Sequence, residues 1–142
     1  MYKNALNPTY QELALFLLRL ILGSIFIAHG AQKVLGIFGG KGIEQFVQFG
    51  ASMNVPAIFM WAAAYAEFIG GLFMFFGIAT ELGALFEIPV MIGAIVLVHG
   101  DKGYFAQNGG FEYALNLMLL AIVVIIGGPG CCALWDPFIK YR

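Results

Sequence analysis

Charged residues are scarce in this sequence. Asp, Glu, Lys and Arg make up only 11% of its 142 residues, whereas about 25% is typical of soluble domains. So few charges cannot cover the surface of a soluble domain of this length. Seven basic residues against eight acidic ones give a formal net charge of −1, which provides no field to attract nucleic acid. We therefore expect neither a water-soluble domain nor a nucleic-acid partner.

Cysteines and cofactor motifs are equally sparse. The two cysteines, Cys131 and Cys132, are adjacent, so they form neither a disulfide framework nor a C-x-x-C redox or zinc motif. The sequence contains no phosphate-binding glycine loop and no haem, flavin or iron-sulfur motif. Its two histidines lack H-x-x-H or E-x-x-H spacing. We therefore expect no metal site and no intrinsic cofactor, which argues against an enzyme that works alone.

Hydrophobic residues dominate instead, at 61% of the chain. A bilayer core requires about 20 mostly apolar residues per helix, and four segments meet this requirement: residues 13–34, 57–78, 82–99 and 111–128. Helices are the expected spanning form because lipid satisfies no backbone hydrogen bonds. The predicted fold class is all-α: a single domain over residues 1–142, folded as a four-transmembrane-helix bundle with both termini on the same side of the membrane.

The longest connection, residues 36–56, carries a helical pattern of its own. Ile43, Phe46 and Val47 share one helical face, opposite a polar face. This pattern favours a short interfacial helix between the first two spans. An ordinary ordered loop is the alternative.

Ionisable residues lie inside the apolar segments, where an unpaired charge is expensive. Arg19, His29 and Lys33 fall within about 80° of one another on the first helix and form one polar stripe. Glu67 lies near the middle of the second span, so it must be paired, protonated or exposed to water. Arg19 and Glu87 lie at nearly the same depth, so an ion pair between them is geometrically possible.

The C-terminal ends of the first and third predicted spans resemble each other in sequence. "IFIAHGAQK" (residues 25–33) and "IVLVHGDKG" (residues 95–103) both contain an apolar run, His-Gly and a nearby lysine. Glu112 and Asn116, four residues apart, share a face of the fourth helix. A bundle that hides these groups would enclose a polar interior between its helices.

This polar interior is the candidate functional site. The candidate catalytic residues are His29, Glu67 and His99, and the candidate substrate-binding residues are Arg19, Lys33, Glu112 and Asn116. Structural alternatives stay open for two of them. Arg19 could pair with a carboxylate only to fix the helix register, and Lys33 could simply extend to the membrane interface.

Four stretches cover most of the chain: "LLRLILGSIFIAHGAQKVLG" (residues 17–36), "AEFIGGLFMFFGIAT" (66–80), "VHGDKGYFAQNGGFEYALNLMLL" (98–120) and "GGPGCCALWD" (127–136). Together they resemble the DoxX family of small four-helix membrane proteins. The resemblance implies a multi-pass protein of the bacterial inner membrane that is linked to redox chemistry. Relatives include the membrane subunit of a thiosulfate:quinone oxidoreductase and a partner in a thiol-oxidant defence complex. Glu87 and the two cysteines look like departures from the family pattern.

Three classes of function fit this sequence. In the first, the chain is a redox membrane subunit, at most one part of an oxidoreductase, whose polar interior binds a quinone head group or a small sulfur oxyanion. Arg19 or Lys33 would hold the anion. Glu67 and His29 would relay protons, and a partner would supply electrons. The second class is a non-catalytic component that assembles or anchors a larger complex, and the third is a small-solute transporter. The expected partners are the lipid bilayer and other membrane or redox protein subunits.

Overall fold

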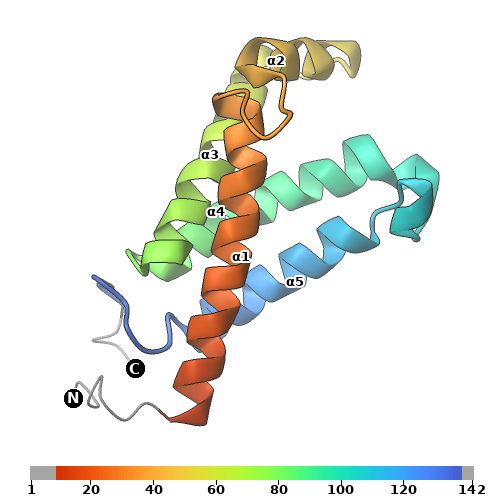
Figure 1. Cartoon of the computed structure of the whole chain (residues 1–142). Coiled ribbons are helices and arrows are strands. Elements are labelled where there is room, and N and C mark those ends of the chain that lie inside the picture. Colours follow the sequence, from red (N-terminus) through yellow and green to blue (C-terminus); the bar gives the residue numbers. More distant parts are fainter. Residues whose placement is uncertain (1–8, 139–142) are drawn as a thin grey trace.

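The computed structural model describes residues 9–138, and over this range every regular element is helical (Figure 1). In chain order the elements are α1 (Tyr10–Val34), α2 (Gly42–Ser52), α3 (Ala57–Phe76), α4 (Thr80–Gly93), the π-helical segment η1 (Ala94–His99), the 3-10 turns η2 (Gly100–Lys102) and η3 (Ala106–Asn108), and α5 (Glu112–Gly127). The predicted all-α fold class is therefore confirmed. The prediction about the two chain termini concerns residues outside the described range and stays a prediction.

Three helical segments are long and apolar enough to cross a membrane. They are α1, α3 and the continuous run Thr80–Lys102, which joins α4 to η1 and η2. These segments match the first three predicted spans. α5 is also apolar but has only 16 residues, fewer than the roughly 20 that an upright span requires. The fourth crossing therefore stays a prediction.

α1 begins at a capping box. The Thr9 hydroxyl accepts a hydrogen bond from the backbone N–H of Glu12 (3.3 Å), and the Glu12 carboxylate accepts one from the backbone N–H of Thr9 (2.7 Å). The 25 residues of α1 rise about 37 Å from this cap. The helix thus carries Arg19 near one end of the molecule and Lys33 near the other.

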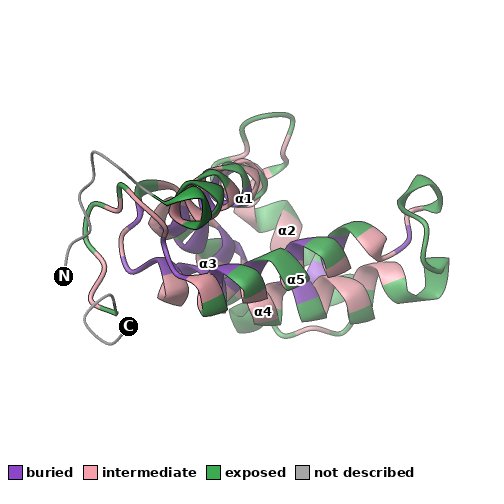
Figure 2. Ribbon diagram, turned by 90° about the horizontal axis from the view of Figure 1, so that it is seen from below, coloured by how far each residue is buried: buried purple, intermediate pink, exposed green. Residues whose placement is uncertain are grey.

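The helices form two hairpins set at a steep angle to each other. α1 packs along α3, α4 packs along α5, and α3 and α4 join the two pairs (Figures 1 and 2). The described helices therefore do not all run side by side, and a regular four-helix bundle is not confirmed. α2 lies crosswise at the ends of α1 and α3 (Figure 1). Its presence confirms the predicted short helix, while its position in the membrane interface stays a prediction.

Glycines allow the helices to touch through their backbones. A Cβ atom at Gly23 of α1 would lie 2.9 Å from the carbonyl oxygen of Gly71 on α3. Gly70 of α3 and Gly83 of α4 meet in the same way, since a Cβ atom on either would lie 2.8 Å from the other's carbonyl oxygen. Such close approach is how small residues promote helix packing inside membranes.

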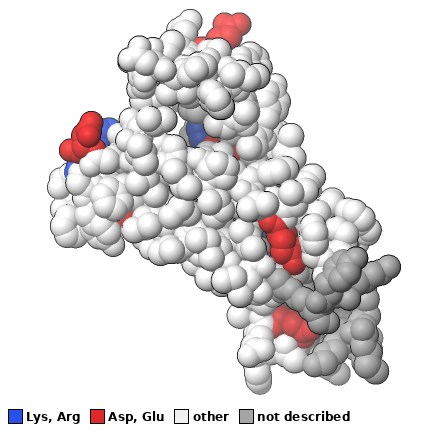
Figure 3. Space-filling view, turned by 180° about the vertical axis from the view of Figure 1, so that it is seen from behind, with Lys and Arg blue, Asp and Glu red and all other residues white. Residues whose placement is uncertain are grey.

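The outer surface is largely apolar. In Figure 3 charged side chains form isolated patches on a mostly uncharged surface. Ile21, Ile58, Val96 and Ile126 are each at least 60% exposed, which would be costly in water and is expected in lipid. The buried residues shown in Figure 2 include a core shared by α1, α3, α4 and α5: Leu22, Phe26, Met74, Ala84, Met91, Leu117, Ala121 and Val124.

Candidate functional site

Arg19 is buried on α1, with 1% of its surface exposed. A guanidinium group has five N–H donors, and here each can reach a backbone carbonyl. Nε donates to Pro129 (2.8 Å), Nη1 to Met74 (3.0 Å) and Phe75 (2.7 Å), and Nη2 to Cys131 (3.3 Å) and Cys132 (3.0 Å). Arg19 therefore ties the end of α3 and the segment after α5 to α1.

This geometry corrects two predictions about Arg19. The ion pair with Glu87 is not formed, because backbone carbonyls surround the guanidinium. For the same reason no donor is left over to hold a substrate anion. Helical rise predicts the depth of a residue, but it does not predict the direction in which the side chain points. The segment after α5 supplies three of the five acceptors, and the sequence pattern gives no sign of this contact.

The opposite end of α1 carries an ion pair. The Lys33 ammonium donates a hydrogen bond to Oε2 of Glu67 on α3. The Glu67 side chain is 2% exposed and that of Lys33 is 25% exposed. The ammonium also lies 5.3 Å from the centre of the Phe46 ring on α2, within the range of a cation-π contact. Of the three states predicted for Glu67, the structure has the paired one, and Lys33 points inward instead of extending to the interface.

A second buried carboxyl group lies on α4. Glu87 is 0% exposed, and within residues 9–138 neither of its carboxyl oxygens has a hydrogen-bond partner. Its Oε1 packs on Gly70 of α3, where an added Cβ atom would lie 2.5 Å away. Gly70 follows Glu67 by about one helical turn, and both Glu67 and Lys33 interact electrostatically with Glu87. The sequence-based set of site residues did not include Glu87.

An apolar pocket of about 470 Å³ lies beside the ion pair. Residues of α2, α3, α4 and η1 form most of its wall, and Lys33 reaches it from α1. Large apolar side chains line much of it, among them Phe46, Phe49, Phe59, Met60 and Leu97. Lys33 and His99 are the two ionisable residues among the described ones that line this apolar pocket.

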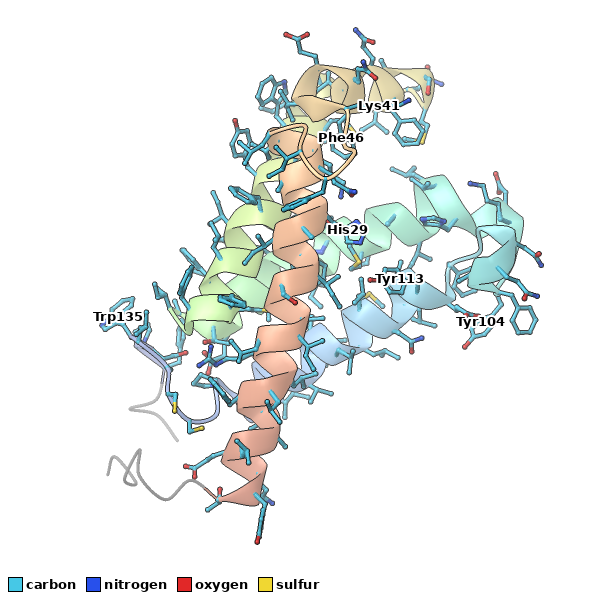
Figure 4. The ribbon with its side chains drawn as sticks, viewed as in Figure 1. His29, Lys41, Phe46, Tyr104, Tyr113 and Trp135 are labelled. Carbon is cyan, nitrogen blue, oxygen red and sulfur yellow. The ribbon has the colours of Figure 1, made fainter. Side chains whose placement is uncertain are left out.

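A second, polar pocket of about 500 Å³ lies next to the apolar one, and the α2 residues Phe46 and Phe49 line both. Its polar lining residues are Gln32, Lys33, Lys41, Gln45, Gln48 and Ser52, and no acidic residue is among its described lining residues. Figure 4 shows Lys41 and Phe46 at α2, close to the end of α1. Lys33, Phe46 and Phe49 border both pockets, so Lys33 lies where the apolar and polar pockets meet.

The two histidines lie in different surroundings. His99, at the end of η1, borders the apolar pocket, and its Nδ1 lies 2.6 Å from the carbonyl oxygen of Gly109. Because a carbonyl can only accept, Nδ1 carries the proton and Nε2 of a neutral ring is an acceptor. His29 lines neither pocket. Its ring faces Tyr113 of α5, with 6.3 Å between the ring centroids (Figure 4).

The remaining candidates lie apart from both pockets. Glu112 occupies the first turn of α5, where a carboxylate interacts favourably with the helix dipole. Asn116 is exposed one turn further along. Of the predicted polar interior, Lys33 and His99 line the apolar pocket, and Glu67 pairs with Lys33 beside it. No described residue of α5 lines either pocket, and α5 lies further from α2 than α4 does (Figure 1). Within residues 9–138 no three His, Cys, Asp or Glu side chains are grouped as a metal site would need.

Sequence reasoning overlooked the irregular third span. Pro89 lies inside α4 and cannot donate the hydrogen bond that the Leu85 carbonyl would otherwise accept. The helix widens to a π-helical segment five residues later, at Ala94. Such segments often occur at functional sites, and here Pro89 and Ala94 both line the apolar pocket. A proline within an apolar run was the available signal for this feature.

Comparisons with known proteins point to one membrane family. The DoxX family model matches residues 14–100. The "Putative oxidoreductase CatD" of Bacillus subtilis is 38% identical over 129 residues, which cover 90% of this chain and 88% of that protein. An uncharacterized protein of Haemophilus influenzae is 28% identical over 138 residues, covering 92% and 95%. The inner membrane protein YqjF of Escherichia coli is 25% identical over 120 residues, covering 84% and 88%. No solved structure matches the chain.

Proposed function

The chain belongs to the DoxX family of membrane proteins, and on this basis we propose that it is the membrane subunit of an oxidoreductase that binds a quinone in the apolar pocket. The family match, the three apolar spans and the inner-membrane relative make it a multi-pass protein of the bacterial inner membrane. The name of the Bacillus subtilis relative supports a redox role. The observation that carries the proposal is an ion pair between the buried Glu67 carboxylate and Lys33, whose side chain lines the apolar pocket.

The chemistry of the pocket suits a lipid-soluble ring compound with polar oxygens. Its volume of about 470 Å³ falls within the roughly 300–1,000 Å³ of small-molecule sites. Aromatic and methionine side chains provide apolar contact. The Lys33 ammonium can donate a hydrogen bond to a ring carbonyl, and His99 stands at the same pocket. Because the sequence has no electron-carrying cofactor motif, a partner subunit supplies the electrons.

Quinone reduction consumes two electrons and two protons, so the site must also handle protons. Lys33 and His99 line the pocket, and Glu67 pairs with Lys33 beside it. In the proposed relay, Lys33 donates to the ring oxygen and Glu67 balances the ammonium charge. His99 exchanges protons at Nε2. His29 takes no part in this relay, because it lies against Tyr113.

Binding of a short-chain quinone analogue to the protein in lipid nanodiscs tests this proposal. We expect Lys33→Met to weaken binding by about 10- to 100-fold, because a hydrogen bond to a charged group contributes about 1.5–3 kcal/mol. Glu67→Gln should also weaken binding, because Lys33 loses the partner that orients it. Lys41→Met is the matched control: it removes the same charge from a residue that lines only the polar pocket, so affinity should not change.

Two results would overturn the quinone proposal. One is the absence of analogue binding to the wild-type protein. The other is equal affinity in the Lys33, Glu67 and Lys41 variants. In either case, stoichiometric co-purification with other subunits would favour the assembly or anchoring function, and solute flux into vesicles would favour the transport function.

The polar pocket favours a small oxyanion as a second ligand. Lys33 and Lys41 border it, together with three glutamines whose side-chain amides can donate hydrogen bonds. We expect thiosulfate to raise the unfolding temperature of the wild-type protein. Lys41→Met should abolish this shift and leave quinone affinity intact, whereas Lys33→Met should affect both ligands. Equal stabilisation of Lys41→Met and the wild-type protein would contradict an oxyanion site.

A further inference from the structure

Glu87 has no role in the function proposed above, although its surroundings are unusual. It is 0% exposed, and neither carboxyl oxygen has a hydrogen-bond partner within residues 9–138. An ionised carboxylate is poorly tolerated in such a place because it has neither water nor donors to stabilise its charge. The neutral acid, which must keep a proton, is the form that this site accommodates.

The α3-α4 contact sets Glu87 beside the ion pair. Gly70 and Gly83 let these two helices touch, and the Glu87 carboxyl lies over Gly70, about one turn from Glu67. Among the described residues, Glu67 from α3 and Lys33 from α1 are the charged groups near enough to act electrostatically on Glu87. One ammonium group, that of Lys33, is therefore available to balance the charges of two carboxyl groups on neighbouring helices.

The charge of this group of three depends on one proton. With Lys33 and both carboxyl groups ionised, the group would carry one uncompensated negative charge inside the membrane. With one proton on either carboxyl, its net charge is zero. Like charges held close together disfavour double ionisation, so a single proton shared by the two carboxyl groups is the arrangement with the least buried charge.

We propose that Lys33, Glu67 and Glu87 form a proton site, in which Glu87 holds one exchangeable proton that keeps the net charge of the three groups at zero. When the site gives its proton to an acceptor in the apolar pocket, it keeps one negative charge until a proton from water replaces the lost one.

The proposal that this site supplies protons for quinone reduction rests on the proposed function. The existence of the proton site does not depend on that function. Infrared spectroscopy of the protein in nanodiscs without quinone therefore tests the proton site separately. The carbonyl stretch of a protonated carboxylic acid is resolved from that of a carboxylate and shifts in heavy water. We expect such a band at neutral pH in the wild-type protein and its loss in Glu87→Gln.

Two further variants test whether the three groups share one proton. Lys33→Met removes the cation, so both carboxyl groups should be protonated and the band should about double. Glu67→Gln leaves Lys33 without its partner, so Glu87 should ionise to replace it and the band should vanish. Because these variants perturb the site in opposite directions, either one tests the coupling if the other does not fold. Glu44→Gln, on the exposed face of α2, is the control and should leave the band unchanged.

Three results would overturn the proton site. They are the absence of a band in the wild-type protein, a band that survives in Glu87→Gln, and a band that is unaltered in both Lys33→Met and Glu67→Gln. The last result would mean that Glu87 is neutral but independent of the ion pair. If the expected pattern appears and no quinone analogue binds, the proton site stands and the proposed function fails.

Discussion

Arg19 and Glu87 are both buried and form no salt bridge within residues 9–138, and the structure accommodates them in different ways. A guanidinium cannot give up its proton in a protein, so Arg19 is stable only because five carbonyls accept its hydrogen bonds. A carboxyl group can be neutralised by a proton, so Glu87 does not require a set of hydrogen-bond partners around it. The ion pair of Lys33 with Glu67, by contrast, follows the simple rule that opposite charges meet inside membranes.

Replacing Arg19 should loosen the end of the molecule where the tail after α5 is held. Lysine has three donors, so in Arg19→Lys at least two carbonyls lose their partner, at a cost of about 1–3 kcal/mol each. Arg19→Met leaves all five unpaired and should lower the free energy of unfolding by at least about 3–5 kcal/mol. Thermal unfolding in nanodiscs measures the loss. Lys102→Met, on the exposed turn η2, is the control. If Arg19→Met and Lys102→Met unfold at the same temperature, Arg19 does not stabilise this end of the molecule.

Among the elements, α3 occupies the centre of the fold. It contacts α1 through Gly71 and α4 through Gly70, and it carries Glu67 between these two partners. The same pair of glycines thus packs three helices and sets the spacing of the carboxyl groups. Packing and site geometry are therefore coupled in α3.

Gly70→Ala tests this coupling. The added methyl group would lie 2.5 Å from Oε1 of Glu87 and 2.8 Å from the backbone oxygen of Gly83. Because backbone cannot move aside easily, we expect a loss of about 1–3 kcal/mol of stability and a change in the carboxylic acid band of Glu87. Gly93→Ala in α4 is the matched control, since nothing lies within 4 Å of its added Cβ atom. The stability of Gly93→Ala should equal that of the wild-type protein or exceed it by up to about 1 kcal/mol, because alanine has a higher helix propensity than glycine. Equal stability of both variants would contradict a tight α3-α4 contact.

The positions of the long helices were predictable from the sequence, because each long apolar run corresponds to one helix. Residues 57–78 were predicted as a span, and α3 covers Ala57–Phe76. The direction of each side chain was not predictable in the same way. Glu67 was expected to need a partner, yet the choice of Lys33 depends on the contact between α1 and α3, which lie far apart in the sequence. The possible pairing of Arg19 with Glu87 is not formed, because the acceptors of Arg19 are backbone carbonyls, which leave no signal in side-chain patterns.

At the scale of the whole molecule, the two ends of the α1-α3 pair are built differently. At one end, the segment after α5 bonds to the backbone of α1, to the end of α3 and to the start of α4: Cys131 N to Glu12 O (3.2 Å), Leu134 N to Phe76 O (3.3 Å), Trp135 N to Gly77 O (3.0 Å) and Thr80 N to Asp136 Oδ2 (3.1 Å). At the other end, α2 covers the helices and borders both pockets. The tail therefore stabilises one end, and the candidate site occupies the other.

Cysteine labelling from one side of the membrane tests whether α5 completes a fourth crossing. Cys132 is exposed, whereas burial raises the pKa of the Cys131 thiol, so Cys132 should react first with an impermeant maleimide. In a variant without the native cysteines, Thr9→Cys should label from the same side as Cys132, because α1 begins next to the tail. Ser52→Cys and Gln107→Cys should label from the opposite side. If Gln107→Cys labels from the same side as Cys132 while Ser52→Cys does not, α5 does not cross. In that case Thr80–Lys102 would not complete a crossing either, since it connects that same side to the turn before α5.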